Sequence, residues 1–126
     1  MLPFTVSLRP GDPIHEQVTY AVTKAIVSGQ LRPGDPFPSV RTLSQELRIN
    51  PNTAHKAVTA LVDQGLLVVR PGVGTVVESV RPGSARGLFD HDTERLVVEA
   101  RQSGLSLYQV LAAVRRHWIR IVGRTA

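Results

Sequence analysis

Two helix-start signals lie close together in the stretch Pro38–Lys56, and they constrain the fold more than any other feature of the sequence. Ser39 has a hydroxyl that can accept a hydrogen bond from a free amide in the first turn of a helix. Asn50-Pro51 repeats the signal, because Asn is a favoured cap and Pro suits the first helical position, where no amide is needed. Gly65 then marks the end of the second helix. The stretch predicts two helices joined by about three or four residues, a helix-turn-helix unit whose second helix can lie in the DNA major groove.

Apolar residues recur on one face of each expected helix, at the spacing of helical turns. In the first helix these residues are Leu43 and Leu47, and in the second they are Ala54, Ala57, Val58 and Leu61. Both faces are therefore expected to enter one core.

The length limits the number of domains, and the charge indicates what kind of partner the protein binds. The chain has 126 residues, which allow one ordinary domain or a small domain with an appendage, and 42% of them are hydrophobic. The formal net charge is +5, and 13 of the 15 basic residues are Arg. Because Arg forms paired hydrogen bonds with phosphate and with guanine, this balance favours an anionic partner, although a mildly basic surface is the simpler interpretation.

Several classes of protein do not fit the sequence. The chain has no Cys, and therefore no disulfide framework, thiol nucleophile or Cys-ligated zinc site. No apolar run approaches the roughly 20 residues that span a bilayer, and the N-terminus does not resemble a signal peptide, so we expect a cytoplasmic protein. The four His residues are scattered without metal-ligand spacing, and no recognisable catalytic set is present, so neither a metal, a cofactor nor an enzyme activity is expected.

The segments before the central unit predict an arm, a helix and a bend. Residues 1–11 are expected to form a short arm with at most a brief extended segment. Asp12-Pro13 is expected to open a helix that ends at Gly29, with Asp12 as its cap. Ile14, Val18, Val22, Ala25 and Ile26 form its apolar stripe. Residues 31–38 contain three prolines and cannot be helical, so they predict a bend with Leu31 and Phe37 in the core.

Two β-branched runs around a Pro/Gly turn follow the second helix of the central unit. They span residues 66–70 and 75–78 and predict a β-hairpin, the wing of a winged helix. Residues 12–78 are therefore expected to form a winged helix-turn-helix domain, and the composition of residues 79–87 is typical of a linker.

The last segment, residues 88–126, predicts two more helices. Asp90 or Asp92 is expected to start the first, Ser103-Gly104 to end it, and Ser106 and Gln109 to form a capping box for the second. The apolar stripe of the second helix contains Leu107, Val110, Leu111, Val114, Trp118 and Ile121. Two such helices cannot build a core alone, so they must pack on the winged helix or on a second copy. We favour a second copy, and expect a mainly α fold with a small β-hairpin and a C-terminal two-helix dimerisation region.

Ordered motifs along residues 11–78 together resemble the GntR family of bacterial transcription regulators. The motifs are Pro13-Ile14-His15-Glu16-Gln17-Val18, Ile26-Val27-Ser28-Gly29-Gln30-Leu31-Arg32-Pro33-Gly34-Asp35, Pro38-Ser39-Val40-Arg41-Thr42-Leu43, Leu47-Arg48-Ile49-Asn50-Pro51-Asn52-Thr53, Leu61, Gly65-Leu66-Leu67 and Gly74-Thr75. The motifs Ser39-Val40-Arg41 and Asn50-Pro51-Asn52-Thr53, together with the short tail that contains Gly104-Leu105-Ser106-Leu107, resemble the YtrA subfamily. This resemblance implies a two-helix dimerisation region in place of a large effector domain. It also implies a repressor, often of an operon that holds its own gene and an ABC transporter.

The sequence departs from the family pattern in the turn and in the wing. Arg48 stands where the family usually has Gly, so the turn is expected to hold a non-Gly residue at positive φ. Pro71 and Val73 replace wing residues that are commonly polar or basic, and Val77 replaces a common Phe. These apolar replacements predict weaker minor-groove contact by the wing.

The candidate DNA-binding residues lie at the starts of the two central helices and in the wing. They are Ser39, Arg41, Asn50, Asn52, Thr53, His55, Lys56, Arg70, Gly72 and Gly74. Helix caps, surface ion pairs and solvated side chains are the simpler roles for the same residues. Of the outward-facing residues, Asn52 or His55 is the better candidate for reading bases, and Lys56 for binding phosphate.

The expected function is a DNA-binding transcriptional regulator, most consistent with a homodimeric repressor on a pseudo-palindromic operator of double-stranded DNA. A non-specific architectural DNA-binding protein is the main alternative, and a protein-interaction module is a second. The sequence does not identify a small-molecule effector.

Overall fold

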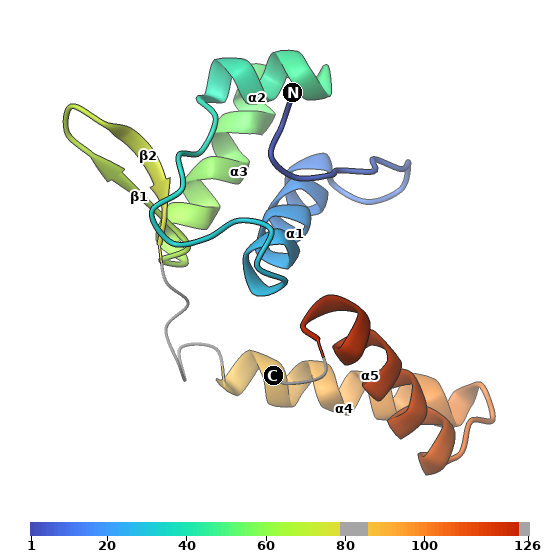
Figure 1. Ribbon diagram of the computed structural model, residues 1–126. Coiled ribbons are helices and arrows are strands. Elements are labelled where there is room, and N and C mark those ends of the chain that lie inside the picture. Colours follow the sequence, from blue (N-terminus) through green and yellow to red (C-terminus); the bar gives the residue numbers. More distant parts are fainter. Residues whose placement is uncertain (79–85, 124–126) are drawn as a thin grey trace. The chain divides into compact units, whose positions relative to one another are not determined.

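The chain forms two compact units, Met1–Val80 and Arg81–Ala126, which are called the N-terminal unit and the C-terminal unit below (Figure 1). The structure is a computed structural model that describes residues 1–78 and 86–123. The predicted linker, residues 79–87, therefore lies mostly outside the described residues. Within the described part of the chain, no helix is long and apolar enough to cross a membrane.

Three helices build the N-terminal unit: α1 (Ile14–Val27), α2 (Val40–Leu47) and α3 (Pro51–Asp63). Helix α3 contacts α1, α2 and the first strand of the wing, and therefore lies at the centre of the unit (Figure 1). Its apolar face, Ala54, Ala57 and Leu61, is fully buried. The expected core residues Val18, Val22, Leu31, Phe37 and Leu43 join it.

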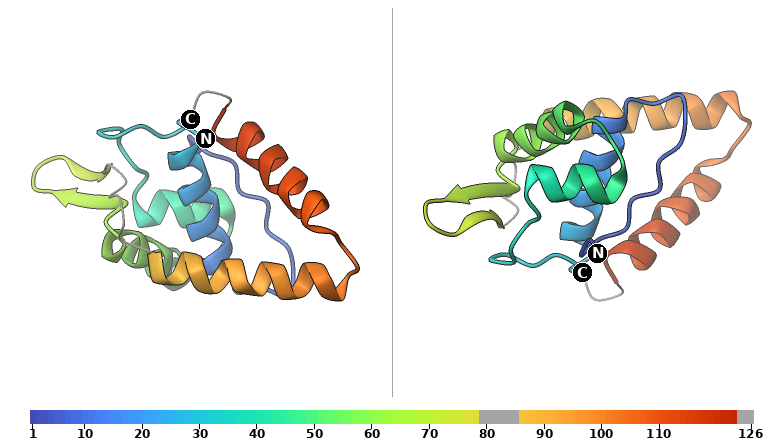
Figure 2. Two further views of the ribbon diagram at one scale, coloured as in Figure 1. Left: turned by 90° about the horizontal axis from the view of Figure 1, so that it is seen from below. Right: turned by 90° about the horizontal axis from the view of Figure 1, so that it is seen from above.

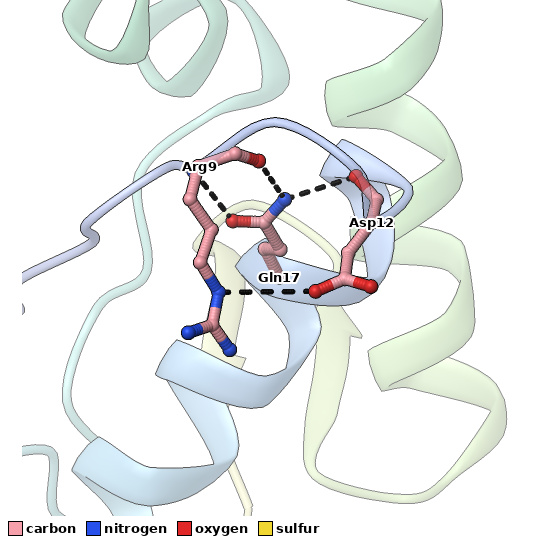
Figure 3. Close-up of polar contacts among 3 residues, drawn as sticks. All are labelled: Arg9, Asp12 and Gln17. Carbon is pink, nitrogen blue, oxygen red and sulfur yellow. Dashed lines mark hydrogen bonds and ion pairs between the residues drawn. The ribbon is translucent and has the colours of Figure 1, made fainter.

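The start of α1 differs from the expectation. Pro13 is the capping position, and no side chain caps the helix. The Asp12 carboxylate instead approaches Arg9, with 3.8 Å between its Oδ2 and the Arg9 Nε. Gln17 holds this turn, because its Oε1 accepts from the Arg9 amide (2.9 Å) and its Nε2 donates to the carbonyls of Arg9 (2.8 Å) and Asp12 (3.0 Å) (Figure 3). The side chain of Gln17 thus ties the N-terminal arm to α1.

The arm is part of the core, a role that the predicted short arm with a brief extended segment did not include. Phe4 is 4% exposed and stacks on Phe37 with 5.6 Å between ring centroids. Leu2, Val6 and Leu8 pack against the same core at alternate positions, the period of an extended chain with one face inward. The arm therefore covers an apolar surface that the three helices leave open.

The wing is the expected antiparallel hairpin of β1 (Leu67–Arg70) and β2 (Gly74–Val77), in which Leu67 pairs with Val77 and Arg70 with Gly74. The proline-rich bend adds a third extended segment to β2. The Gly34 amide donates to the Val77 carbonyl (2.8 Å), the Val77 amide to the Asp35 carbonyl (2.9 Å) and the Phe37 amide to the Thr75 carbonyl (2.8 Å). These bonds connect the wing to the segment that leads into α2.

The C-terminal unit consists of α4 (Arg86–Gln102) and α5 (Leu107–Ile121), joined by a short turn. Helix α4 begins at Arg86, earlier than the predicted start at Asp90 or Asp92. No acidic residue lies in the first turn of α4, so Asp90 and Asp92 do not mark its start. The capping box of α5 is present as predicted, with the Gln109 amide donating to Ser106 Oγ (3.2 Å) and the Ser106 amide to Gln109 Oε1 (2.8 Å).

The helices of the C-terminal unit diverge from their turn and bury little against each other (Figure 2). Ala100 is the one buried residue among the side chains described in residues 89–123. The apolar faces of both helices are consequently open to solvent in a single chain.

Candidate nucleic-acid interface

Helix α2 begins at a cap that uses the hydroxyl of Ser39. Its Oγ accepts from the Thr42 amide (3.1 Å) and donates to the Thr42 Oγ1 (3.0 Å). The cap serves one of the first-turn amides, so the amides of Val40 and Arg41 keep no partner in the described part of the chain. The start of α2 can therefore donate hydrogen bonds to an anion.

Helix α3 begins at the second predicted cap. The Asn50 Oδ1 accepts from the Asn52 amide at 2.8 Å, and Pro51 occupies the first helical position. The side-chain amide of Asn50 keeps its two donor hydrogens, and the Thr53 amide has no partner among the described residues. Both are placed where the positive end of the helix dipole favours a phosphate group.

The turn between these helices has the left-handed residue that the sequence predicted. Arg48 has φ 55° and ψ 47°, and it is the one residue other than Gly with a positive φ in the described chain. The Ile49 amide donates to the Ser44 carbonyl (3.0 Å), and the Arg48 amide donates to the Gln45 carbonyl (3.3 Å). This pair of bonds is a Schellman motif, which usually has Gly at the position of Arg48. The motif sets the angle at which α3 leaves α2.

One polar stripe runs along the outward face of α3. Asn52, His55, Lys56 and Thr59 are spaced at three and four residues, so they share one side of the helix. All except Thr59 were predicted from the sequence, and all four are exposed. The opposite side of α3 is buried, so this stripe is the face of α3 that a duplex can reach.

Asp63 continues the stripe at the C-terminal end of α3. Its carboxylate repels phosphate, which confines favourable contact with DNA to the first turns of the helix. The helix start, with its caps and open amides, is therefore the end suited to approach a duplex.

Two arginines lie in the helix and the turn that precede this helix start. The guanidinium groups of Arg41 on α2 and Arg48 in the turn are exposed, and neither has an ion pair or hydrogen bond within residues 1–78 and 86–123. Arg41 was a predicted contact. Arg48 was considered only for its backbone, although a basic residue between the two helices was itself a signal of phosphate contact. Thr59 lies on the same face and was not predicted, and its spacing of seven residues from Asn52 is the signal that places it there.

The wing presents a mixed tip. Arg70 and the predicted Gly72 and Gly74 are exposed, and the two glycines have φ +77° and +107°. Open space surrounds both, so they are required by backbone conformation and not by close packing. Val69 and Val73 are 62% and 71% exposed, so the tip is largely apolar.

No cluster of three or more His, Asp or Glu residues that could hold a metal ion occurs in the parts of the chain that the structure describes. The groups that this surface exposes are hydrogen-bond donors and positive charges: guanidinium groups, an ammonium group, side-chain amides and helix-start amides.

Comparison with known proteins identifies this arrangement. The model of bacterial regulatory proteins of the gntR family matches residues 7–77. The HTH-type transcriptional repressor YtrA of Bacillus subtilis is 28% identical over 116 residues, which cover 89% of this chain and 85% of that protein. The histidine utilization repressor of Klebsiella aerogenes is 38% identical over 73 residues, 58% of this chain and 30% of that protein.

Solved structures agree with the sequence comparison. YtrA from Sulfolobus acidocaldarius, a GntR-family transcription factor, superposes with a TM-score of 0.63 at 32% identity, over 75% of this chain and 96% of that one. A transcriptional antiterminator from Listeria monocytogenes EGD-e has the same fold, with a TM-score of 0.82 at 23% identity over 98% and 95% of the two chains. The N-terminal winged helix-turn-helix, the helical C-terminal region and the family match together show that this chain is a YtrA-like member of the GntR family of DNA-binding transcription regulators, which are not enzymes.

Proposed function

We propose that the chain is a repressor that binds a pseudo-palindromic operator as a homodimer. The observation that carries this proposal is the start of α3, where exposed polar side chains and two open donors lie together, with two exposed arginines in the preceding helix and turn. The two relatives described above are both named repressors, which supports repression over activation.

The residues of the outward stripe divide between base reading and phosphate binding. Asn52 and His55 carry the short polar groups that suit base edges, and Asn in particular pairs with adenine through two hydrogen bonds. Lys56, Arg41, the Asn50 amide group and the Thr53 amide supply phosphate contacts that fix the register of the protein on the duplex. Arg70 and the glycines of the wing approach the backbone beside this contact.

The C-terminal unit supplies the proposed dimer contact. On α5, Leu107 is 70% exposed, Leu111 56%, Val114 47% and Trp118 52%, and Val110 and Ile121 complete the same stripe. This exposure is unusual for a continuous apolar row on a soluble protein. A second copy of the chain brings an identical row, and the two rows can bury each other about a two-fold axis.

In this proposal, residues 12–78 bind DNA and residues 88–126 form the dimer contact. A dimer places two copies of α3 in successive major-groove faces about 34 Å apart, which explains a pseudo-palindromic operator. Regulation then acts through the spacing or the rigidity of the two N-terminal units, since a ligand shifts the population of one arrangement by binding it more tightly.

The test is fluorescence-anisotropy binding to the DNA upstream of the protein's own gene, against shuffled DNA of equal length, at two salt concentrations. A specific regulator should prefer the first duplex by about a thousandfold or more. Transcription from that duplex in vitro should then fall when the protein is added. Equal affinity for both duplexes contradicts operator recognition at that site.

The exposed valines of the wing favour one second candidate, a non-specific architectural DNA-binding protein. Architectural proteins insert apolar side chains between base steps in the minor groove and bend the duplex. Val69 and Val73 provide such groups. Under this alternative, every duplex is bound with similar affinity, and the protein changes the end-to-end distance of a labelled duplex.

A further inference from the structure

Positive charge is unevenly divided between the two units. The N-terminal unit contains seven basic and six acidic residues, whereas the C-terminal unit contains eight basic and four acidic residues. The unit that carries the DNA-recognition helix therefore contributes +1 to the net charge and the other unit contributes +4. Dimerisation alone does not require this excess, because like charges near an interface between identical chains repel each other.

The excess is concentrated on α5. This helix contains Arg115, Arg116 and Arg120 and has no acidic residue along its length. All three arginines are exposed, and we call them the basic face of α5. At 100° per residue, Arg116 and Arg120 lie opposite the apolar stripe, whereas Arg115 lies about 100° from Arg116, at the edge of the stripe next to Leu111. A dimer that buries the stripe thus leaves Arg116 and Arg120 in solvent.

The charges of the basic face are not neutralised within the described chain. The Arg120 Nη2 lies 2.7 Å from the His117 Nδ1, a contact that orients the guanidinium and involves no carboxylate. Arg115 and Arg116 have no carboxylate partner in the described residues. On α4, by contrast, Arg95 pairs with Glu99 at 3.7 Å. Arg101 on α4 also has no carboxylate partner and donates to the Leu105 carbonyl (3.3 Å), so within the C-terminal unit α5 is the helix that groups several such arginines without an acidic residue.

We propose that the basic face of α5 binds the phosphate backbone of the same DNA that the N-terminal unit recognises, as a second and sequence-independent contact. This inference rests on the proposed DNA-binding function. Guanidinium groups suit phosphate because their planar fork donates two parallel hydrogen bonds. A membrane surface is the less favoured occupant, because an interfacial helix inserts its apolar face into lipid, and that face is assigned here to the dimer.

The size of the expected effect follows from counterion release. Each neutralised phosphate contributes about 0.9 to the slope of log Kobs against log salt concentration on B-form DNA. Arg116 and Arg120 from both protomers of a dimer therefore account for a slope of about 3 to 4. Because the contact does not read sequence, the effect should appear on any duplex.

The experiment compares R116Q/R120Q with the wild-type protein by fluorescence anisotropy on a random-sequence duplex of roughly 40 bp, between about 50 and 200 mM NaCl, the range over which phosphate contacts change affinity strongly. R9Q/R95Q is the matched control. It removes the same number of charges from exposed arginines that each approach a carboxylate, Asp12 and Glu99. We expect the slope to fall by about 3 to 4 for R116Q/R120Q and by less than about 1 for R9Q/R95Q. The charge-conserving R116K/R120K should keep most of the wild-type slope.

An unchanged slope in R116Q/R120Q, with the dimer intact by sedimentation, overturns the inference. An equal decrease of the salt slope in R116Q/R120Q and in R9Q/R95Q also overturns the inference, since it would reflect net charge alone. If R116Q/R120Q no longer binds vesicles of phosphatidylserine and phosphatidylcholine that the wild-type protein binds, and its salt slope on DNA is unchanged, the basic face is assigned to a membrane instead. If the wild-type protein binds no duplex, the proposed function itself fails. If Lys56→Ala weakens binding while R116Q/R120Q does not, only the second contact fails.

Discussion

Phe4 and Phe37 stack in nearly parallel planes, 8° apart, and join the N-terminal arm to the segment that leads into the helix-turn-helix. Both rings are buried, at 4% and 6% exposed. The backbone amide of Phe37 also donates to the wing, at the Thr75 carbonyl. This pair therefore links three segments that are distant in the sequence, and the arm supports the position of the wing.

Replacing Phe4 with Ala should destabilise the N-terminal unit by about 3 to 5 kcal/mol, the usual cost of truncating a buried Phe. Urea denaturation followed by circular dichroism measures the loss. Phe4→Leu retains most of the volume and should cost less than half as much. Equal stability of wild-type and Phe4→Ala proteins would show that the arm is not packed on Phe37.

Arg48→Gly should stabilise the protein by about 1 kcal/mol. A residue with a side chain in the left-handed region is strained by roughly 1–2 kcal/mol, and Gly removes that strain at the expense of a more flexible unfolded chain. Thermal unfolding is the measurement, and the melting temperature should rise.

Arg48→Ala is the matched control, because it removes the guanidinium and keeps the strained Cβ. It should leave stability close to that of the wild-type protein. If Arg48→Gly and Arg48→Ala raise the melting temperature equally, the cause is the loss of positive charge and not the relief of backbone strain.

Local signals predicted the helix starts well. Ser39, Asn50 and Ser106 each cap the predicted helix, since a cap depends on residues within one turn. The positive φ of Arg48 was also predicted, but from the resemblance to a family that usually has Gly at this position. The predicted start of α4 was wrong, because the acidic residues used to predict it lie beyond the first turn of the helix.

Non-local packing was not visible in the sequence. The burial of Phe4 depends on Phe37, and the pairing of residues 34–37 with β2 uses backbone groups of a segment whose prolines suggested only a bend. At the candidate interface, helical periodicity predicted which side chains of α3 face outward. Which of them touch bases depends on the DNA, a partner that the packing of the chain does not specify.

The side chain of Asn50 caps α3 and is proposed to donate to a DNA phosphate, and two substitutions can separate these roles. Asn50→Ala removes the cap and should cost about 1 kcal/mol of stability. Asn50→Asp keeps an acceptor for the Asn52 amide, so stability should stay close to wild type. It should nevertheless weaken DNA binding, because a carboxylate replaces a donor beside the phosphate. An Asn50→Asp protein with unchanged affinity for DNA would restrict Asn50 to capping.

Trp118→Ala should weaken the proposed dimer by an amount that reaches about 3 to 5 kcal/mol if the indole is fully buried in the interface. Tyr108→Ala is the control, since Tyr108 is 86% exposed and lies away from the apolar stripe of α5. Sedimentation equilibrium gives both dissociation constants. If both variants raise the dissociation constant of the dimer equally, or if neither raises it, the stripe is excluded as the dimer contact.

Lys56→Ala distinguishes phosphate binding from base reading on α3. If Lys56 binds phosphate, its loss should weaken every duplex about equally and lower the salt slope by about one unit per protomer. Lys24→Ala is matched in chemistry, because Lys24 is the other lysine of the chain and is exposed on α1, outside the proposed interface. Anisotropy titrations on the upstream and shuffled duplexes, each at several salt concentrations, provide both quantities. A loss of affinity confined to duplexes with one particular base pair would make Lys56 a base reader, since a phosphate contact carries no sequence information.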